Sequence, residues 1–294
     1  MSIGNTPARG IGPSNRVTGS IDSDRIETDL DPRKNLADAQ RLAERYAPIL
    51  VLREGENQTL PANPQDFINH SELREDKSAR FDESHGTNRG PQDIEFDGSD
   101  FANPEDSLFL DLDNSQRERL GRTQDNPAQL NYETDFTTNP PTVTYHVFYA
   151  YNDGLGPQNH EGDFERITLE LNPDTLEPET ALYNAHEHVN VSRYNDVIDP
   201  VTGRPVVYVA AGTRAGHADV GEHGTEVPLV TERIVSNPGN RVPIRSLENA
   251  VIYENWSELV DVTQQDWYTS EQGNDGVRWG EIGETTFADR LAES

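Results

Sequence analysis

Alternating apolar and polar positions recur through the second half of the chain and predict β-strands. In residues 143–151 every odd position is apolar or aromatic, and in residues 164–171 Ile167, Leu169 and Leu171 alternate with polar neighbours. A period of two is typical of a strand with one buried face. Three more strands are predicted from apolar runs, at residues 181–188, 205–211 and 250–253. Because strands dominate, the sequence predicts a mainly β protein built as a two-sheet β-sandwich.

A helical repeat of apolar residues precedes the first strand. Asp31 followed by Pro32 is typical of a helix start, because aspartate caps the first turn and proline suits the first helical position. One face of the expected helix carries five apolar or aromatic residues, namely Leu36, Ala39, Leu42, Ala43 and Tyr46. Pro48 ends this helix, and the apolar run at residues 49–52 predicts a short buried strand.

Two stretches of the chain show no period. Residues 1–30 are rich in Gly, Pro, Ser, Asn and Arg, which predicts an extended N-terminal arm and leaves residues 31–294 as a single domain. Residues 75–142 are acidic and rich in Gly, Pro and Asn. They predict long acidic surface loops with one short helix at residues 114–120. The expected sandwich therefore has few helices, all of them short.

The charge balance of the chain indicates the environment in which the protein is stable. The 294 residues include 53 Asp and Glu against 24 Lys and Arg, which gives a formal charge of −29, and only Lys34 and Lys77 are lysines. Such a charge repels itself and destabilises a compact state at ordinary ionic strength. At about 1 M salt the screening length falls to about 3 Å and the repulsion largely disappears. The composition therefore predicts a halophilic protein, from a haloarchaeon or from a virus of one.

The same composition excludes several classes of protein. A surface this negative cannot bind nucleic acid by neutralising phosphates. The chain has no Cys, so disulfides, thiolate catalysis and Cys-ligated metals are excluded. The longest apolar runs, at residues 47–52 and 206–211, are far shorter than the roughly 18–20 residues of a transmembrane helix. Residues 1–20 lack the apolar stretch of a usual signal peptide. Nucleotide and phosphate-binding motifs are also missing, so no organic cofactor is expected.

Candidate chemistry is concentrated at the start of the strand predicted at residues 164–171. Asp163 and Glu165 have the same parity as the apolar Ile167, so an unbroken strand points both carboxylates to the buried face. A carboxylate pair there is unfavourable unless it is hydrogen-bonded, protonated or bound to a cation. Gly162 permits a bend that brings His160 to the same place. One nitrogen and two oxygen ligands suit Ca²⁺, Mg²⁺ or Mn²⁺ better than a structural zinc.

Simpler explanations of this carboxylate pair stay open. Acidic residues two apart are common in so acidic a chain and are usually solvated. The pair can also be neutralised by an arginine such as Arg214, which lies in a glycine-flanked turn after the strand predicted at residues 205–211.

Other histidines are candidates for the same site. His186 and His188 share a strand face, and His186 is the fourth candidate metal ligand beside His160, Asp163 and Glu165. Glycine-rich turns are often found where sites are built at the rim of a sheet. The residues that such turns add to the candidate rim are Arg214, His217 and His223.

Four segments together resemble the vacuolar-protein-sorting-associated protein 62 family. They are Tyr46-Ala47-Pro48-Ile49 with Glu56 and Pro61, then Tyr149-Ala150-Tyr151-Asn152 with the His160–Glu165 element, then residues 204–215, and finally Trp279-Gly280. The match runs over residues 40–285 and leaves out the arm and much of residues 75–142. Phe164 stands where the family has Trp, and Arg214 stands where it has His. An Arg is always protonated and only donates hydrogen bonds, so it cannot replace a metal ligand or a proton carrier.

A looser resemblance connects the His160–Glu165 element to the necrosis-inducing cytolysins. In that family the similar element surrounds a divalent cation on a β-sandwich that binds membrane lipids. The resemblance implies one divalent cation near His160, Asp163, Glu165 and His186. It does not by itself imply a reaction.

Three functions follow as hypotheses. The favoured one is a non-enzymatic structural or binding protein, such as a decoration, turret or spike component of a virion, which self-associates or binds other structural proteins through residues 1–30. The second is a divalent-metal-dependent hydrolase, with Asp163 or Glu165 as metal ligand or base. The third is a cation-dependent binder of glycans or lipid head groups. The expected location is a virion or an extracellular high-salt medium, and the alternative is the cytoplasm of a haloarchaeon.

Overall fold

The computed structural model describes twelve stretches of the chain. These are residues 36–53, 60–75, 108–116, 119–152, 160–185, 188–210, 214–219, 222–224, 231–233, 244–247, 250–265 and 278–279. The predicted arm at residues 1–30 lies outside them.

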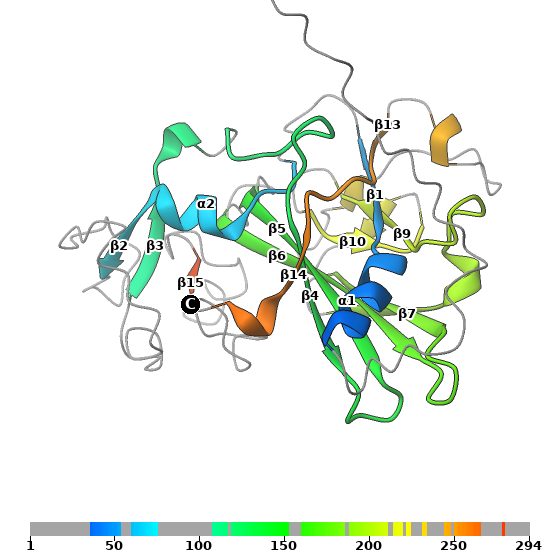
Figure 1. Ribbon diagram of the computed structural model, residues 1–294. Helices are drawn as coiled ribbons and strands as arrows, with labels where there is room; N and C mark the ends of the chain where they lie inside the picture. Colours follow the sequence, from blue (N-terminus) through cyan, green and yellow to red (C-terminus); the bar gives the residue numbers. More distant parts are fainter. Residues whose placement is uncertain are drawn as a thin grey trace, which may run out of the picture.

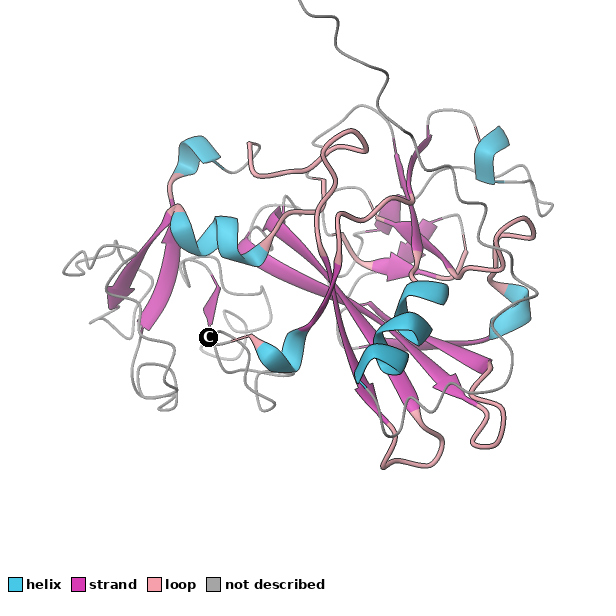
Figure 2. Ribbon diagram, in the orientation of Figure 1, coloured by secondary structure: helices cyan, strands magenta, loops and turns pink. Residues whose placement is uncertain are grey.

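The larger sheet has six strands in the order β14-β4-β5-β6-β7-β8. Their bounds are β4 Leu130–Asp135, β5 Thr142–Asn152, β6 His160–Leu171, β7 Pro178–Ala185, β8 His188–Arg193 and β14 Leu259–Asp261. From β4 to β8 each strand is antiparallel to the next, whereas β14 runs parallel to β4. The sequence predicted β5 and β6 from their alternation, and both are confirmed (Figure 2).

A second sheet of four strands has the order β10-β9-β1-β13. Its members are β1 Ile49–Arg53, β9 Val206–Val209, β10 Gly216–His217 and β13 Ala250–Tyr253. β1 is parallel to β9 and antiparallel to β13, so it lies in the middle although it comes first in the chain (Figure 1). Leu50 and Leu52 point into the gap between the two sheets, while Ile49 and Val51 belong to a separate apolar cluster on the other face. The predicted two-sheet sandwich is thus confirmed.

The core between these two sheets is unusually rich in tyrosine. The odd positions of β5 from Val143 to Tyr149 are buried there beside the inward residues of β6 and β7. Several hydroxyls cross the layer to backbone carbonyls of other elements. The hydroxyl of Tyr145 donates to the Ala43 carbonyl at 2.8 Å, and that of Tyr183 donates to the Val206 carbonyl at 2.9 Å. Buried phenols are thereby satisfied, which a buried hydroxyl requires.

A smaller third layer covers part of the outer face of the six-stranded sheet. It consists of a three-stranded sheet in the order β15-β3-β2, together with helix α2 Pro64–Asn69 (Figure 1). The strands are β2 Ser71–Glu75, β3 Leu108–Leu112 and β15 Arg278–Trp279. Phe67 of α2 packs edge-on against Phe148, an even position of β5. β5 is therefore buried on both faces along its second half, which explains why its even positions Phe148 and Ala150 are apolar as well.

Helix α1, Leu36–Arg45, packs against the sandwich beside β14. Four of the five residues predicted to face the core are buried, but Leu36 is 71 % exposed, so that part of the prediction was wrong. Leu36 is the first residue of the helix and is exposed, whereas Asp38 and Ala39 of the same turn are buried. The predicted helix start at Asp31-Pro32 lies outside the described residues.

Within the described part of residues 75–142, the loop prediction was wrong at residues 108–112 and 130–135, which are strands. These strands are β3 and β4, and the alternation of Leu108, Leu110 and Leu112 is the signal that the acidic surroundings obscured. The helix predicted at residues 114–120 is one 3-10 turn, η3 Asn114–Gln116. The strand predicted at residues 181–188 begins earlier, as β7, and β8 follows it.

The remaining described elements are short. They are the hairpin of β11 Glu222–Gly224 with β12 Thr231–Arg233, and the 3-10 turns η5 Tyr194–Asp196, η6 Ile244–Ser246 and η7 Val262–Gln264. None of the helices in the described stretches has the length and apolar character needed to cross a membrane.

Candidate functional site

The carboxylates Asp163 and Glu165 lie on the core side of β6, as strand parity predicts. Asp163 is opposite Tyr149 and Glu165 is opposite Val147 in the pairing of β5 with β6. Both β5 residues belong to the apolar core of the sandwich. Asp163 and Glu165 are themselves half-buried, because they sit near the end of the strand where the core opens.

Gly162 interrupts this alternation just before Asp163. Its φ is +65°, in the left-handed region that favours glycine. Parity alone would place Glu161 beside Asp163, but the Glu161 carboxylate instead accepts a hydrogen bond from the Leu112 backbone N–H at 2.7 Å. Leu112 belongs to the third layer, on the opposite face of the sheet. Glu161, which is 1 % exposed, therefore holds β3 to β6, and the sequence did not reveal this role.

The guanidinium of Arg214 lies close to the same end of the core. Arg214 is 3 % exposed and immediately precedes Ala215 and strand β10, which contacts β6 and β7. Its φ is +64°, an uncommon conformation for a residue with a long side chain, costing about 1–2 kcal/mol. Gly216 brings the two β9 and β10 backbones together, because a Cβ at this position would lie 2.9 Å from Cγ1 of Val207.

The buried hydroxyl of Tyr149 interacts electrostatically with Arg214, Glu165 and Asp163. Burial raises the pKa of its hydroxyl far above the ordinary value, the positive charge of Arg214 opposes that rise, and the negative charges of Glu165 and Asp163 add to it. All three charged side chains therefore act on one buried phenol. Asn152, also buried, donates from Nδ2 to Oδ2 of Asp163 at 3.0 Å and fixes that carboxylate. We call Tyr149, Asn152, Asp163, Glu165 and Arg214 the rim site.

The other predicted site residues are only partly placed. His217 is buried in β10 opposite Tyr208, close to the rim site along the chain. His160 begins β6 opposite Asn152, and His223 belongs to β11, but neither side chain is among the described ones. His186 lies outside the described residues. Among the residues that are described, no three His, Asp or Glu side chains gather as a metal site would require.

The donor chemistry of the rim site fits a hard cation in part. Asp163 and Glu165 offer carboxylate oxygens on one face of one strand, which are the ligands that Ca²⁺, Mg²⁺ and Mn²⁺ prefer. The same carboxylates are near a guanidinium that never loses its proton. Arg214, being permanently protonated, can donate hydrogen bonds to a polar ligand but cannot itself accept a proton in a reaction.

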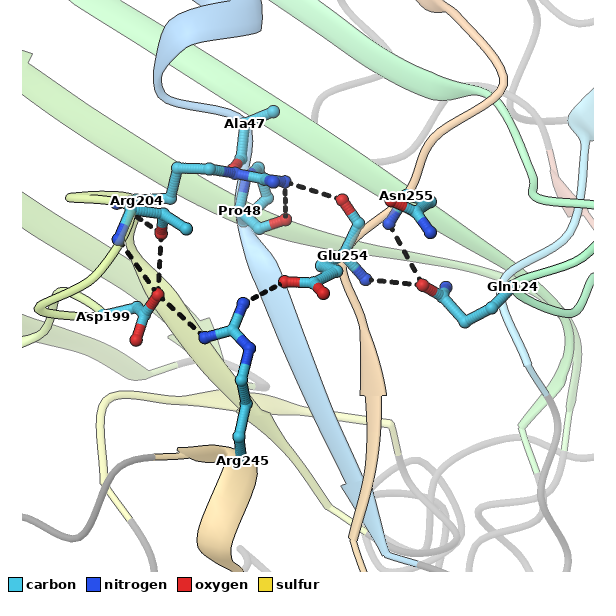
Figure 3. Close-up of polar contacts among 9 residues, drawn as sticks. Ala47, Pro48, Gln124, Asp199, Arg204, Arg245, Glu254 and Asn255 are labelled. Carbon is cyan, nitrogen blue, oxygen red and sulfur yellow. Dashed lines mark hydrogen bonds and ion pairs between the residues drawn. The ribbon is translucent and has the colours of Figure 1, made fainter. Parts of the chain in front are cut away.

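A second polar cluster, which the sequence did not predict, lies where β1 begins and β13 ends (Figure 3). Arg204 donates from Nε to the Ala47 carbonyl at 2.5 Å, and from Nη2 to the carbonyls of Pro48 at 3.2 Å and Glu254 at 3.0 Å. Burial lowers the pKa of Arg204, while the negative charge of Glu254 opposes this. The guanidinium thus joins the end of α1 to the segments that precede β9 and follow β13. We call this cluster the arginine clasp.

Arg245 completes the arginine clasp with ion pairs. Its Nη1 is 3.1 Å from Oδ2 of Asp199 and its Nη2 is 2.5 Å from Oε2 of Glu254 (Figure 3). Asp199 is 1 % exposed; burial acts to raise the pKa of its carboxyl, but hydrogen bonds from Thr202 and Arg245 outweigh that effect and lower it. Arg204 and the segment at residues 46–49, which both belong to the first family resemblance, are therefore in contact, and this contact holds the fold together.

The chain was compared with known proteins. No model of a known protein family matches it, and no curated protein is similar to it. The resemblance to the vacuolar-protein-sorting-associated protein 62 family therefore rests on the quoted motifs alone.

Several solved structures resemble this chain at a low level. "NLPPya in complex with glucosamine" is 14 % identical, with a TM-score of 0.40 over 92 % of this chain and 95 % of that one. "Toxin fold for microbial attack and plant defense" is 13 % identical, with a TM-score of 0.41 over the same shares. Necrosis and Ethylene inducing Protein 2, from the causal agent of cocoa's Witches Broom disease, is 13 % identical, with a TM-score of 0.39 over 85 % of this chain and 89 % of that one. Likeness at this level carries no conclusion about family, ligand or activity.

Proposed function

We propose that this protein is a non-enzymatic binding protein and that its ligand is held at the rim site. The observation that carries the proposal is Arg214, a buried arginine with a left-handed backbone near two half-buried carboxylates. Uncommon backbone conformations persist only where the surrounding structure holds them, and they concentrate at functional sites. A permanently charged group in this place supports recognition of a polar ligand and disfavours acid–base catalysis, which the alternative of a hydrolase would need.

The ligand class that we propose is a hydroxylated head group, of a glycan or a lipid, bound through one divalent cation. Asp163 and Glu165 would supply carboxylate oxygens, and His160 and His186 would supply ring nitrogens. Ca²⁺, Mg²⁺ and Mn²⁺ all accept such oxygen-rich sites, and a bound cation can take two sugar hydroxyls as further ligands. Asn152 supports this assignment, because it already orients the Asp163 carboxylate.

The setting that we propose is a high-salt medium outside a cell, including the surface of a virion. The negative charge of the whole chain supports the high salt. A structural role would use residues 1–30 to bind a neighbouring subunit. Light scattering on the full chain and on a chain without these residues tests that role: unchanged assembly would count against it.

Metal analysis after dialysis tests the cation. We expect one divalent cation per wild-type chain and none in the double variant Asp163→Asn with Glu165→Gln. The matched control is Glu177→Gln with Glu179→Gln, an exposed acidic pair with the same spacing. Wild-type protein without a divalent cation above background would refute the cation, and equal loss in the control would show that binding is only a general effect of charge.

A second measurement tests the choice between binding and catalysis. Arg214→Met is expected to weaken head-group binding by about tenfold or more, which corresponds to about 1.4 kcal/mol. If the protein were instead a hydrolase, the wild type with added Ca²⁺, Mg²⁺ or Mn²⁺ would cleave ester or phosphoester substrates. Turnover that disappears in the Asp163→Asn variant would overturn the non-enzymatic proposal.

A further inference from the structure

Strand β8 forms one edge of the six-stranded sheet. In the described part of the chain it pairs with β7 and with no second strand. Only four large hydrophobic residues are strongly exposed among the described ones, and two of them, Val189 and Val191, occupy alternate positions of β8. Their exposed fractions are 52 % and 66 %. The outer edge of this sheet is therefore apolar.

Both valines lie on the face of the sheet that is turned away from the sandwich core. Val191 is opposite Leu182 and Val189 is opposite Asn184 in the pairing of β7 with β8. The buried positions of β7, Ala181 and Tyr183, have the other parity. Leu182 of β7 and Val191 of β8 are therefore neighbours on the outer face, and Val189 lies beside them on the edge strand.

β8 lacks the features by which proteins keep edge strands unpaired. Such edges usually carry a lysine, a proline, an inward-pointing charge or a bulge. The six residues His-Val-Asn-Val-Ser-Arg contain none of these and no acidic residue, and their one charged side chain, Arg193, stands at the very end of the strand. The pairing with β7 is regular along the strand. An edge of this kind is a template for another strand.

We propose that β8 pairs with β8 of a second copy of this chain, antiparallel and with Asn190 on the two-fold axis. In this register Val189 lies opposite Val191 of the partner subunit, and the reverse contact is made by symmetry. A two-fold axis moved by one residue to Val191 would keep Val191 opposite Val191 of the partner subunit, but it would place Val189 opposite the partner's Arg193, so one valine pair would remain instead of two. Directly opposed β-branched pairs stabilise a sheet by about 0.2–1 kcal/mol each, so the register centred on Asn190 is favoured.

The charge distribution identifies a second copy as the occupant. Two copies with a charge of −29 each repel one another, and at about 1 M salt, where the screening length is about 3 Å, the repulsion comes mainly from carboxylates close to the contact. β8 itself carries no carboxylate, since Arg193 is its only formally charged residue, and its outward neighbours on β7, Thr180, Leu182 and Asn184, are uncharged. The strand is also complementary to itself about Asn190. One strand edge buries less than the roughly 1,200–2,000 Å² of a stable interface, so we expect a weak dimer that dissociates on dilution.

Sedimentation equilibrium over about a hundredfold range of concentration, in high salt, tests the dimer directly. We expect the wild type to pass from monomer to dimer and Val191→Lys to raise the dissociation constant at least about tenfold. The matched control is Val201→Lys, which alters an exposed valine in the turn before β9 and should leave the constant unchanged. A wild type that remains monomeric throughout overturns the proposal. A Val191→Lys variant that keeps its mass but melts earlier also overturns it, because another part of this chain would then cover β8.

Disulfide trapping tests the register, since the chain has no cysteine of its own. Directly opposed residues have Cβ atoms about 4.5–5.5 Å apart, close to the separation that a disulfide needs. We therefore expect Asn190→Cys to cross-link faster than Val191→Cys, and Val201→Cys to cross-link slowest. Fastest linking at Val191→Cys would overturn the register, and equal rates at all three positions would overturn the interface.

Discussion

At the scale of single residues, Gly162 decides which carboxylates belong to the rim site. Its left-handed backbone sends Glu161 to the outer layer, where it accepts the Leu112 N–H, and leaves Asp163 and Glu165 on the core side. Three carboxylates within five residues therefore have two different tasks. Alternation in the sequence predicted that Asp163 and Glu165 face the core. It could not predict that Glu161 faces the other layer, because the pattern of apolar residues does not reveal the φ of Gly162.

Replacing Gly162 by alanine should disturb both tasks. We expect Gly162→Ala to lower the free energy of unfolding by about 1–2 kcal/mol, because a Cβ is unfavourable at φ +65°. Chemical denaturation measures the change. The matched control is Gly203→Ala, since Gly203 has φ +70° and no atom near its would-be Cβ. Both variants should lose similar stability, whereas only Gly162→Ala should alter metal or head-group binding.

At the scale of elements, the arginine clasp explains how distant segments come together. Arg204 reaches the end of α1 and the end of β13 with one guanidinium, while Arg245 pairs with Asp199 and Glu254. Arginine spreads five donors over three nitrogens in a planar fork, whereas the three donors of lysine all sit on one nitrogen and cannot reach acceptors as far apart. The arginine clasp therefore depends on the shape of the side chain as well as its charge.

Conservative replacement separates shape from charge. Arg204→Lys should lower the free energy of unfolding by about 1–3 kcal/mol, because buried carbonyls of Ala47, Pro48 and Glu254 lose donors. Arg245→Lys should cost less than about 1 kcal/mol, since Arg245 is partly exposed and forms ion pairs that a lysine can retain. Urea unfolding with an unchanged m-value would check both. Equal losses at the two positions would contradict the stated role of Arg204.

How far the sequence predicts these elements depends on what each pattern contains. β5, β13 and the core half of β6 follow from alternation or from a short apolar run. β3 and β4 were missed because acidic loop residues surround them. The burial of the outer face of β5 was also missed, because the third layer that covers it cannot be inferred from the alternation of β5 alone. At the rim site, strand parity placed Asp163 and Glu165 on the buried face, and an arginine such as Arg214 was considered as their partner. The buried Tyr149 and Asn152 were not predicted as site residues, because their role depends on pairing across strands.

At the scale of the whole molecule, the acidic surface sets the conditions under which the fold is stable. The charge of −29 is spread over the chain rather than gathered in one segment. The screening length falls with the square root of ionic strength, so repulsion of this kind weakens as salt is added, and it acts on the compact state more than on the unfolded one.

Salt should therefore stabilise the protein strongly. We expect the melting temperature to rise by more than about 10 °C between about 0.1 and 2 M NaCl, given that about 1 kcal/mol shifts the melting temperature of a domain this large by about 2–4 °C. Circular dichroism during heating measures it, and an uncharged osmolyte at matched osmolality is the control. A melting temperature that does not respond to NaCl would contradict the halophilic interpretation.

High pH should unfold the protein through its buried tyrosines. Burial raises the pKa of Tyr132 to about 12 and raises those of Tyr145, Tyr149 and Tyr183 further. These phenols ionise near pH 10 in the unfolded chain. Their contribution to the stability of the fold is therefore complete below pH 10, and it is lost as the pH rises toward their pKa values in the folded protein. Each should remove about 1.4 kcal/mol of stability per pH unit in that window.

The alkaline transition has a distinct signature. Most of the tyrosinate absorbance and the loss of circular dichroism should appear together in one step, because the buried phenols become accessible only on unfolding; the half-buried Tyr151 and Tyr208 can ionise earlier. Tyr183→Phe should move the midpoint to higher pH. Ionisation of most of the tyrosines before the fold is lost would contradict the described burial.

The position of β1 has a consequence for how the chain is made. β1 is an early segment, yet its partners β9 and β13 come much later, and Arg204 and Trp256 bond to Ala47 and Pro48 across 157 and 208 residues. During synthesis the apolar run from Ile49 to Leu52 must wait for most of the polypeptide to leave the ribosome before its neighbours exist. Contacts of such long range slow folding and leave apolar segments exposed meanwhile. The nascent protein therefore has a vulnerable interval that ends only when its C-terminal third arrives.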